Sequence, residues 1–118
     1  MKVVNIGDVA AQDASDNPIF RGKVSIQRLI GDSSGELRVS VVNFSPGAVN
    51  VFHTHTFDQV LYVTQGEGIV STEEKEVKVT PGTVIFIPAG ENHWHGATKE
   101  SKFSHIAIMP PGETRFRG

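Results

Sequence analysis

The sequence predicts an all-β domain, built as an antiparallel sandwich or barrel, and three observations indicate this fold class. Short runs rich in Val, Ile, Phe and Thr recur along the chain, as half-buried pleated strands require. Turn-forming segments such as SPG, QGEG, TPG and PAGEN separate these runs. No segment shows a convincing helical period. Many short strands at such spacing are typical of a sandwich or barrel.

The runs and turns define the expected elements in order. We expect strands over residues 24–30, 37–44, 49–55, 59–64, 68–72, 75–79, 83–87 and 103–109. The dipeptides Pro46-Gly47 and Pro81-Gly82 fit the central positions of type II turns, because Pro fixes φ and Gly accepts a positive φ. Residues 1–20 are polar and weakly patterned, which predicts an N-terminal arm that contacts a partner subunit, or an edge strand that the partner completes.

Composition limits the classes of function. The 118 residues predict one domain over residues 1–118, and a net charge of −2 gives no reason to expect nucleic acid. The absence of Cys excludes disulfides and thiolate ligands. No segment approaches the ~18 apolar residues of a membrane span, and the N-terminus lacks the apolar run of a signal peptide. We therefore expect a cytoplasmic protein without a membrane partner.

Histidines at strand spacing predict a metal site. His53 and His55 occupy positions i and i+2, so on a strand they point to one face, about 7 Å apart. Gln59 and His93 can close the set around one ion. A lone histidine is more often structural, but three at these spacings favour ligands. Imidazole suits Mn, Fe, Co, Ni, Cu and Zn, so the set predicts a divalent transition metal without identifying it.

Gln59 is a neutral amide where a carboxylate would be expected. If its oxygen coordinates, the cation keeps its full charge, binds anions better and resists oxidation, which favours Lewis-acid chemistry over oxygen activation. The alternative is an inward polar residue that hydrogen-bonds another group of the site.

Further side chains are expected around the same cavity. Ser40 and Val42 have the parity of an inward face and would set the cavity volume. His95 shares the parity of His93 and can line the same cavity, and the alternative is a histidine that is solvated or hydrogen-bonded to groups around the site. His105 alternates with Ala107 and Met109, and its ordinary pKa near 6.5 suits proton exchange with a substrate, although a plain interior histidine is the alternative. The remaining aromatic residues are expected in the core or the cavity wall: Trp94, Phe52, Phe57, Phe86 and Tyr62.

Two glycine-framed motifs resemble those of the cupin superfamily. The first stands as Gly47, His53, His55, Gln59 and Gly66, with Gln in the usual Glu position. The second stands as Gly82, Pro88, Gly90 and His93, and the family's usual Asn four residues later is Ala97. The resemblance implies a jelly-roll barrel, also called a double-stranded β-helix, with a metal at its centre, commonly in a homodimer.

A narrower resemblance concerns small single-domain bacterial cupins that include manganese-dependent hydroxynitrile lyases. The segments HTHTFDQVLYVTQGEG, IPAGENHWHGAT and SHIAI carry it. It implies manganese held by His53, His55, Gln59 and His93, with His105 as the catalytic histidine. Those proteins usually have Pro-x-Gly before the Gln, whereas this chain has Thr56-Phe57-Asp58, so the pocket shape and the substrate stay open.

Three functions are compatible with these residues. The leading one is an enzyme that uses the metal as a Lewis acid on a small organic substrate, with cleavage of a cyanohydrin as a concrete case. The first alternative is a metal-dependent dioxygenase, which three-histidine cupins often resemble. The second is a cupin without catalytic activity that binds or senses a small molecule.

Overall fold

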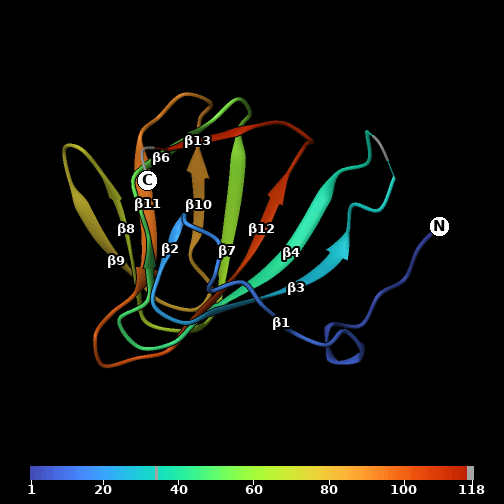
Figure 1. Cartoon of the computed structure of the whole chain (residues 1–118), viewed down its shortest axis with the longest axis horizontal. Helices are drawn as coiled ribbons and strands as arrows, with labels where there is room; N and C mark the ends of the chain where they lie inside the picture. The colour runs from blue at the N-terminus through green and yellow to red at the C-terminus, as the bar shows by residue number, and fades with distance from the viewer. Residues whose placement is uncertain (34, 117–118) are drawn as a thin grey trace.

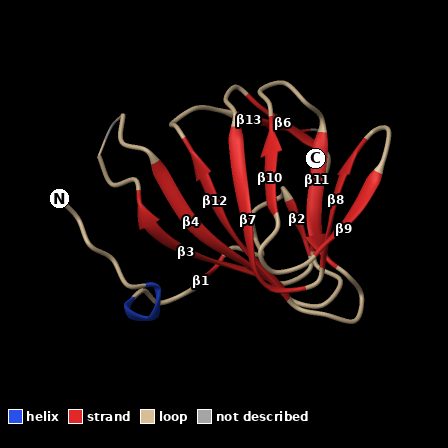
Figure 2. Cartoon of the chain, turned by 180° about the vertical axis from the view of Figure 1, so that it is seen from behind, coloured by secondary structure: helices blue, strands red, loops and turns tan. Residues whose placement is uncertain are grey.

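Two antiparallel sheets face each other in the computed structural model, which describes residues 1–33 and 35–116 (Figure 1, Figure 2). The first sheet contains, in spatial order, β1 (Gln12–Asp13), β3 (Val24–Ile30), β4 (Arg38–Phe44), β12 (Phe103–Met109), β7 (Gln59–Gly66) and β10 (Val84–Ile87). The second contains β13 (Thr114–Phe116), β6 (His53–His55), β11 (His93–Ala97), β5 (Val49–Asn50) and β2 (Phe20–Arg21), and it continues from β11 through β8 (Gly68–Thr72) and β9 (Glu76–Val79). The predicted all-β, double-sheet architecture is confirmed.

One predicted strand, over residues 49–55, is wrong as a single element, because it divides into β5 and β6. β5 pairs with β11 through Val49 and Gly96, whereas β6 pairs with the same strand through His53 and His93. These two pairings differ in register by one residue, so Val51 and Phe52 leave the ladder. As a consequence Asn50 and His53, three residues apart, are both buried.

Two strands beside the histidines, β11 and β13, were not predicted. The segment His93–Ala97 contains no Val or Ile and has a glycine inside it, so its composition is poor for a strand. The segment Thr114–Phe116 is short and charged, and its pairing partner β6 lies about 60 residues earlier in the chain. Tertiary pairing forms both strands despite their weak local preference.

Glycines permit the turns and one close approach of strands. Gly47 and Gly82 have φ of +79° and +91°, as the predicted type II turns require. Gly96 lies where β11 meets β5, and a Cβ atom there would stand 2.5 Å from the Cα of Val49. The absence of that atom lets β5 lie directly against the strand that carries His93.

Three of the aromatic residues expected in the core or the cavity wall are not part of the core, although Phe86 lines a cleft beside β10. The exposed fraction is 61% for Phe86, 42% for Tyr62 and 40% for Phe52. Phe86 and Tyr62 occupy strand positions that alternate with inward residues, so they lie on the outer face of the first sheet. The buried aromatic core is formed instead by Phe44 and Phe103, whose ring centroids are 5.8 Å apart.

The N-terminal residues extend away from the barrel beyond β3, on the right of Figure 1. They include a single-turn 3-10 helix, Ile6–Asp8, followed by β1. The Gln27 side-chain amide donates hydrogen bonds to the carbonyl oxygens of Ile6 and Val9, which holds this segment against β3. The described residues include no helix that is long and apolar enough to cross a membrane.

Candidate metal centre

Three histidines converge at one place in the interior. His53 and His55 project from β6 and His93 from the neighbouring strand β11, and all three are buried. One ring nitrogen from each lies within 4.8 Å of the others. The predicted convergence of these three side chains is confirmed, and their type and spacing suit a divalent metal ion.

Backbone carbonyl groups orient two of these rings. Nδ1 of His53 lies 2.7 Å from the carbonyl oxygen of Val51, and Nδ1 of His93 lies 2.8 Å from that of Glu91. Because a carbonyl oxygen only accepts, each Nδ1 carries the hydrogen and Nε2 keeps its lone pair. Nδ1 of His55 meets the hydroxyl of Thr114 at 3.0 Å. Sequence reasoning missed Thr114, since only the unpredicted strand β13 brings it to the site.

Buried atoms without partners face the same cluster. Among the described residues, Nε2 of His55, Nε2 of His93 and Oε1 of Gln59 are buried and have no hydrogen-bond partner. Buried polar atoms are rarely left unpaired, and metal coordination would satisfy all three. Gln59 Nε2 donates to the Met109 sulfur at 3.4 Å, which leaves Oε1 as the free atom. The residues present therefore fit a metal ion with three imidazole ligands and one amide ligand.

Burial keeps the three rings neutral. Burial, together with repulsion from His93, lowers the pKa of His53 to about 3 and that of His55 to about 4. Burial also lowers the pKa of His93, against an opposing effect of the Glu91 carbonyl. At neutral pH the three lone pairs are therefore available to a cation without first losing a proton.

A second pair of histidines lies beside the first three. The ring of His95 is 5.8 Å from that of His53, and on its other side His95 Nδ1 lies 3.1 Å from Nε2 of His105. Burial lowers the pKa of His95 well below 6.5, and the nearby His105 lowers it further. Burial likewise lowers the pKa of His105 to about 4. Both rings are therefore neutral near pH 7.

Asn50 completes this pair and was missed by sequence reasoning. Its Oδ1 accepts the backbone N–H of His95 at 2.7 Å, and its Nδ2 lies 3.2 Å from Nε2 of the same residue. Strict alternation back from His53 would point Asn50 outward. The register shift between β5 and β6 turns it inward, and no local signal in the sequence marks that shift.

A cavity of about 280 Å³ lies over β3, β4 and β12. Ser40 and Val42 line it, as does Met109, whose sulfur accepts the hydrogen bond from Gln59. Val42 pairs across the strands with His105, so both point to the interior. Val42 therefore lies opposite His105, whereas Ser40 pairs with Ala107 further along the cavity wall.

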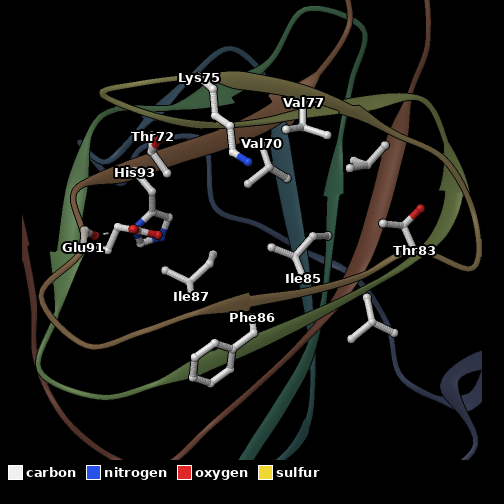
Figure 3. A pocket seen from close by; sticks show the side chains of 12 residues that line it. Val70, Thr72, Lys75, Val77, Thr83, Ile85, Phe86, Ile87, Glu91 and His93 are labelled. Carbon is white, nitrogen blue, oxygen red and sulfur yellow. Dashed lines mark hydrogen bonds between the residues drawn. The ribbon is translucent and has the colours of Figure 1, made fainter.

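A second cleft of about 340 Å³ opens between β9 and β10 (Figure 3). Apolar side chains such as Val70 and Ile85 project into it, and His93 lies at its inner end. Lys75 and Glu91 are exposed residues of the same lining. Because β10 and β3 lie near opposite edges of the first sheet, the two cavities flank the histidines from different sides.

Trp94 is the predicted cavity residue that the structure does not bring into the cluster. It lies between His93 and His95 on β11, and side chains alternate along a strand. Both histidines are buried in the interior, so Trp94 points to the opposite face of the second sheet, where it is half-buried.

Comparison with known proteins supports the arrangement. The model of the cupin domain family matches residues 40–114, which include every proposed ligand. An (R)-mandelonitrile lyase from Granulicella tundricola is 36% identical over 110 residues, which cover 90% of this chain and 84% of the lyase. A cupin-like protein from Thermotoga maritima superposes with a TM-score of 0.82 at 28% identity, covering 100% of this chain and 90% of that one. The fold is therefore a cupin barrel.

A more distant similarity involves a regulator. The HTH-type transcriptional activator RhaR of Yersinia pestis is 27% identical over 77 residues. The match covers 65% of this chain but only 27% of the regulator's length.

Burial of His105 predicts that acid destabilises the metal-free protein. With a pKa of about 4 when folded and 6.5 when unfolded, His105 takes up a proton more readily in the unfolded chain. Its contribution to the free energy of unfolding is complete above pH 6.5 and is lost as the pH falls towards 4. The total loss is roughly 3 kcal/mol, because each unit of difference between the folded and unfolded pKa corresponds to about 1.4 kcal/mol. Urea unfolding between pH 7.5 and 5 should show a steeper loss for the wild type than for His105→Gln. Equal slopes would contradict this account.

Proposed function

Since the chain belongs to the cupin family, we propose that it is a metal-dependent lyase that cleaves cyanohydrins of small carbonyl compounds. The observation that carries the proposal is the position of His105. This neutral, buried base is hydrogen-bonded to His95, next to a three-histidine and amide ligand set. The 36% identity to an (R)-mandelonitrile lyase supports the same reaction class.

The ligand set proposed is His53, His55, His93 and Gln59, with manganese(II) as the ion on the family resemblance. Such a divalent ion would act as a Lewis acid that polarises the substrate oxygen. The protein contributes the orientation of the ligand atoms through the carbonyl oxygens of Val51 and Glu91.

In this proposal His105 moves the proton. During cleavage the hydroxyl proton of the cyanohydrin passes to the ring of His105, and the electron pair left on oxygen forms the carbonyl bond. The carbon–carbon bond breaks, and its electrons leave with cyanide. His105 then returns the proton to cyanide, so the products are the carbonyl compound and hydrogen cyanide.

The cavity over β3, β4 and β12 is the proposed substrate site. Its volume of about 280 Å³ suits a small organic molecule, and Ser40, Val42 and Ala107 form part of its wall. Met109 lines this cavity and accepts a hydrogen bond from Gln59, which supports a substrate site near the proposed ligand atoms. Exclusion of water by this wall would favour proton transfer between the substrate and His105.

A second copy of this chain is the proposed partner, on the outer face of the first sheet. One cross-strand row on this face runs through Gln27, Val41, Ile106, Tyr62 and Val84. Gln27 is hydrogen-bonded to the N-terminal segment, whereas Tyr62 and Val84 are 42% and 64% exposed. Uncharged aromatic and aliphatic patches of this kind are typical of subunit contacts. With no nucleic-acid or membrane partner proposed, we assign the homodimer to the cytoplasm.

Removal of ligands should empty the metal site. Loss of a residue that only hydrogen-bonds a metal ligand typically lowers the metal affinity ~10–100-fold. The double variant His53→Ala/His93→Ala loses two ligands and should therefore retain almost no manganese. Elemental analysis after manganese loading and desalting measures the content per chain. His105→Ala is the matched control and should hold as much metal as the wild type. Full metal content in the double variant would show that the ligands are elsewhere.

Loss of His105 should abolish turnover but not metal binding. General acid–base groups contribute ~10²–10⁴-fold, so His105→Ala should cleave mandelonitrile at least ~100-fold more slowly. Benzaldehyde release, followed by ultraviolet absorbance with the manganese-loaded protein, measures the rate. A wild type that binds mandelonitrile without releasing benzaldehyde would instead indicate a binding protein.

Charge on the outer face should separate the subunits. Phe86 is 61% exposed next to the Tyr62 and Val84 row, so Phe86→Glu should place a desolvated charge in the contact. Light scattering coupled to gel filtration should give a dimer for the wild type and a monomer for this variant. Leu37→Glu, at a residue 51% exposed outside the row, should remain dimeric. A monomeric wild type would refute the proposed contact.

A further inference from the structure

Two arginines lie on the inner face of the first sheet, at the rim of the proposed substrate cavity. Arg28 pairs across the strands with Ser40, and Ser40 pairs in turn with Ala107, a core residue that is 3% exposed. Arg38 pairs with Met109, which packs against the same core cluster as Ala107. Directly paired residues share a face of the sheet, so both arginine side chains project on the cavity side, and both line the cavity.

The cavity wall changes from apolar to cationic along β4. Val42, Ser40 and Arg38 follow one another on one face of this strand, from the row that contains His105 to the exposed rim. At about 3.4 Å per residue, Arg38 lies ~14 Å from Val42 along the strand. A long arginine side chain covers part of this distance, so a molecule with one six-membered ring can reach from the rim to His105. The end of β3 and the start of β4 project past the second sheet, which leaves the rim open to solvent (Figure 1).

Neither rim arginine has an ionic partner in the protein. The salt bridges among the described residues involve the cations Lys2, Lys78 and Arg115, and they leave out Arg28 and Arg38. A guanidinium group stays charged at any pH at which the protein is folded, and its planar set of N–H donors matches the two oxygens of a carboxylate. The donors at the rim are therefore available to an anionic ligand.

The charge balance at the rim favours a ligand with a single negative charge. One carboxylate, that of Asp32, lines the cavity together with the two arginines, so these three side chains carry a net charge of about +1 at neutral pH. The neighbouring Glu36 is already neutralised by its ion pair with Lys2. A carboxylate would balance this charge, whereas a phosphate dianion would be repelled by Asp32.

We propose that Arg28 and Arg38 are specificity-determining residues that bind a carboxylate of the substrate while its hydroxyl end lies near His105. The substrate class is then the cyanohydrin of an oxo acid, with the carboxylate at the opposite end from the carbon that bears the nitrile. Charge-assisted hydrogen bonds to the guanidinium groups would hold it in one orientation. The assignment of a cyanohydrin rests on the proposed lyase function, whereas the preference of the cavity for a carboxylate does not.

Binding of two alcohols of equal shape tests this preference without turnover. The probes are para-(hydroxymethyl)benzoate and its neutral amide, para-(hydroxymethyl)benzamide, titrated into the manganese-loaded protein by calorimetry near neutral pH. We expect the wild type to bind the benzoate at least ~10-fold more tightly, because charge-assisted hydrogen bonds are about twice as strong as neutral ones. Arg28→Gln/Arg38→Gln should bind both probes equally. Both positions are exposed, so this double variant should fold.

The matched control is Arg21→Gln. Arg21 is an exposed arginine of the second sheet, and its guanidinium donates to the carbonyl oxygens of Pro18 and Phe20, away from the cavity. Its loss removes the same charge from the protein as the loss of one rim arginine. The control should therefore retain the full preference for the benzoate.

Turnover provides a second readout. The manganese-loaded wild type should cleave para-carboxymandelonitrile with a kcat/KM at least ~10-fold above that for the carboxamide analogue. The ratio of the two values should fall to about one in Arg28→Gln/Arg38→Gln and should stay unchanged in Arg21→Gln.

The outcomes separate this inference from the lyase proposal. Equal affinity of the wild type for both probes would overturn the inference, as would a preference that persists in the double variant, since another cation would then bind the carboxylate. Tighter binding of para-(hydroxymethyl)phenylphosphonate than of the benzoate would overturn the assignment of a carboxylate. The expected preference in a protein that cleaves neither cyanohydrin would leave the inference standing and contradict the proposed function.

Discussion

The chemistry of this barrel depends on where the proton of each buried imidazole resides. Five histidines lie in the interior, and burial makes all of them neutral near pH 7. A neutral ring has one donor and one acceptor, so the partner of one nitrogen determines what the other can do. Carbonyl oxygens take the Nδ1 hydrogens of His53 and His93, and this leaves Nε2 lone pairs for a cation.

The same constraint divides the histidines into two groups with different tasks. His93 and His95 share one face of β11 and would be equivalent by strand parity alone. Their partners differ, because a carbonyl acceptor frees Nε2 of His93, whereas the ring of His95 lies beside the amide of Asn50 and 3.1 Å from the ring of His105. The second sheet thus supplies both a ligand and a link to His105 from neighbouring positions of one strand.

Much of the fold and of the ligand cluster could be predicted because the signals are local. Period-two patterning and Pro-Gly turns predicted β3, β8 and β12 with the bounds that the structure shows, and two-residue spacing placed His53 beside His55. Asn50 could not be predicted, since its inward direction depends on a register shift that only the pairing of β5 and β6 with β11 creates. Thr114 and β13 depend on long-range pairing. Phe86 lines a cleft but lies outside the core, because period-two patterning identifies two strand faces without saying which one is buried.

The central claim is that three Nε2 atoms and the Gln59 oxygen hold one divalent ion. A crystal structure of the manganese-loaded protein, with anomalous scattering measured for manganese, tests it most directly. The account predicts one anomalous peak at bonding distance, about 2.0–2.2 Å, from Nε2 of His53, His55 and His93 and from Oε1 of Gln59. A peak elsewhere, or a Gln59 amide that turns away from the ion, would contradict it.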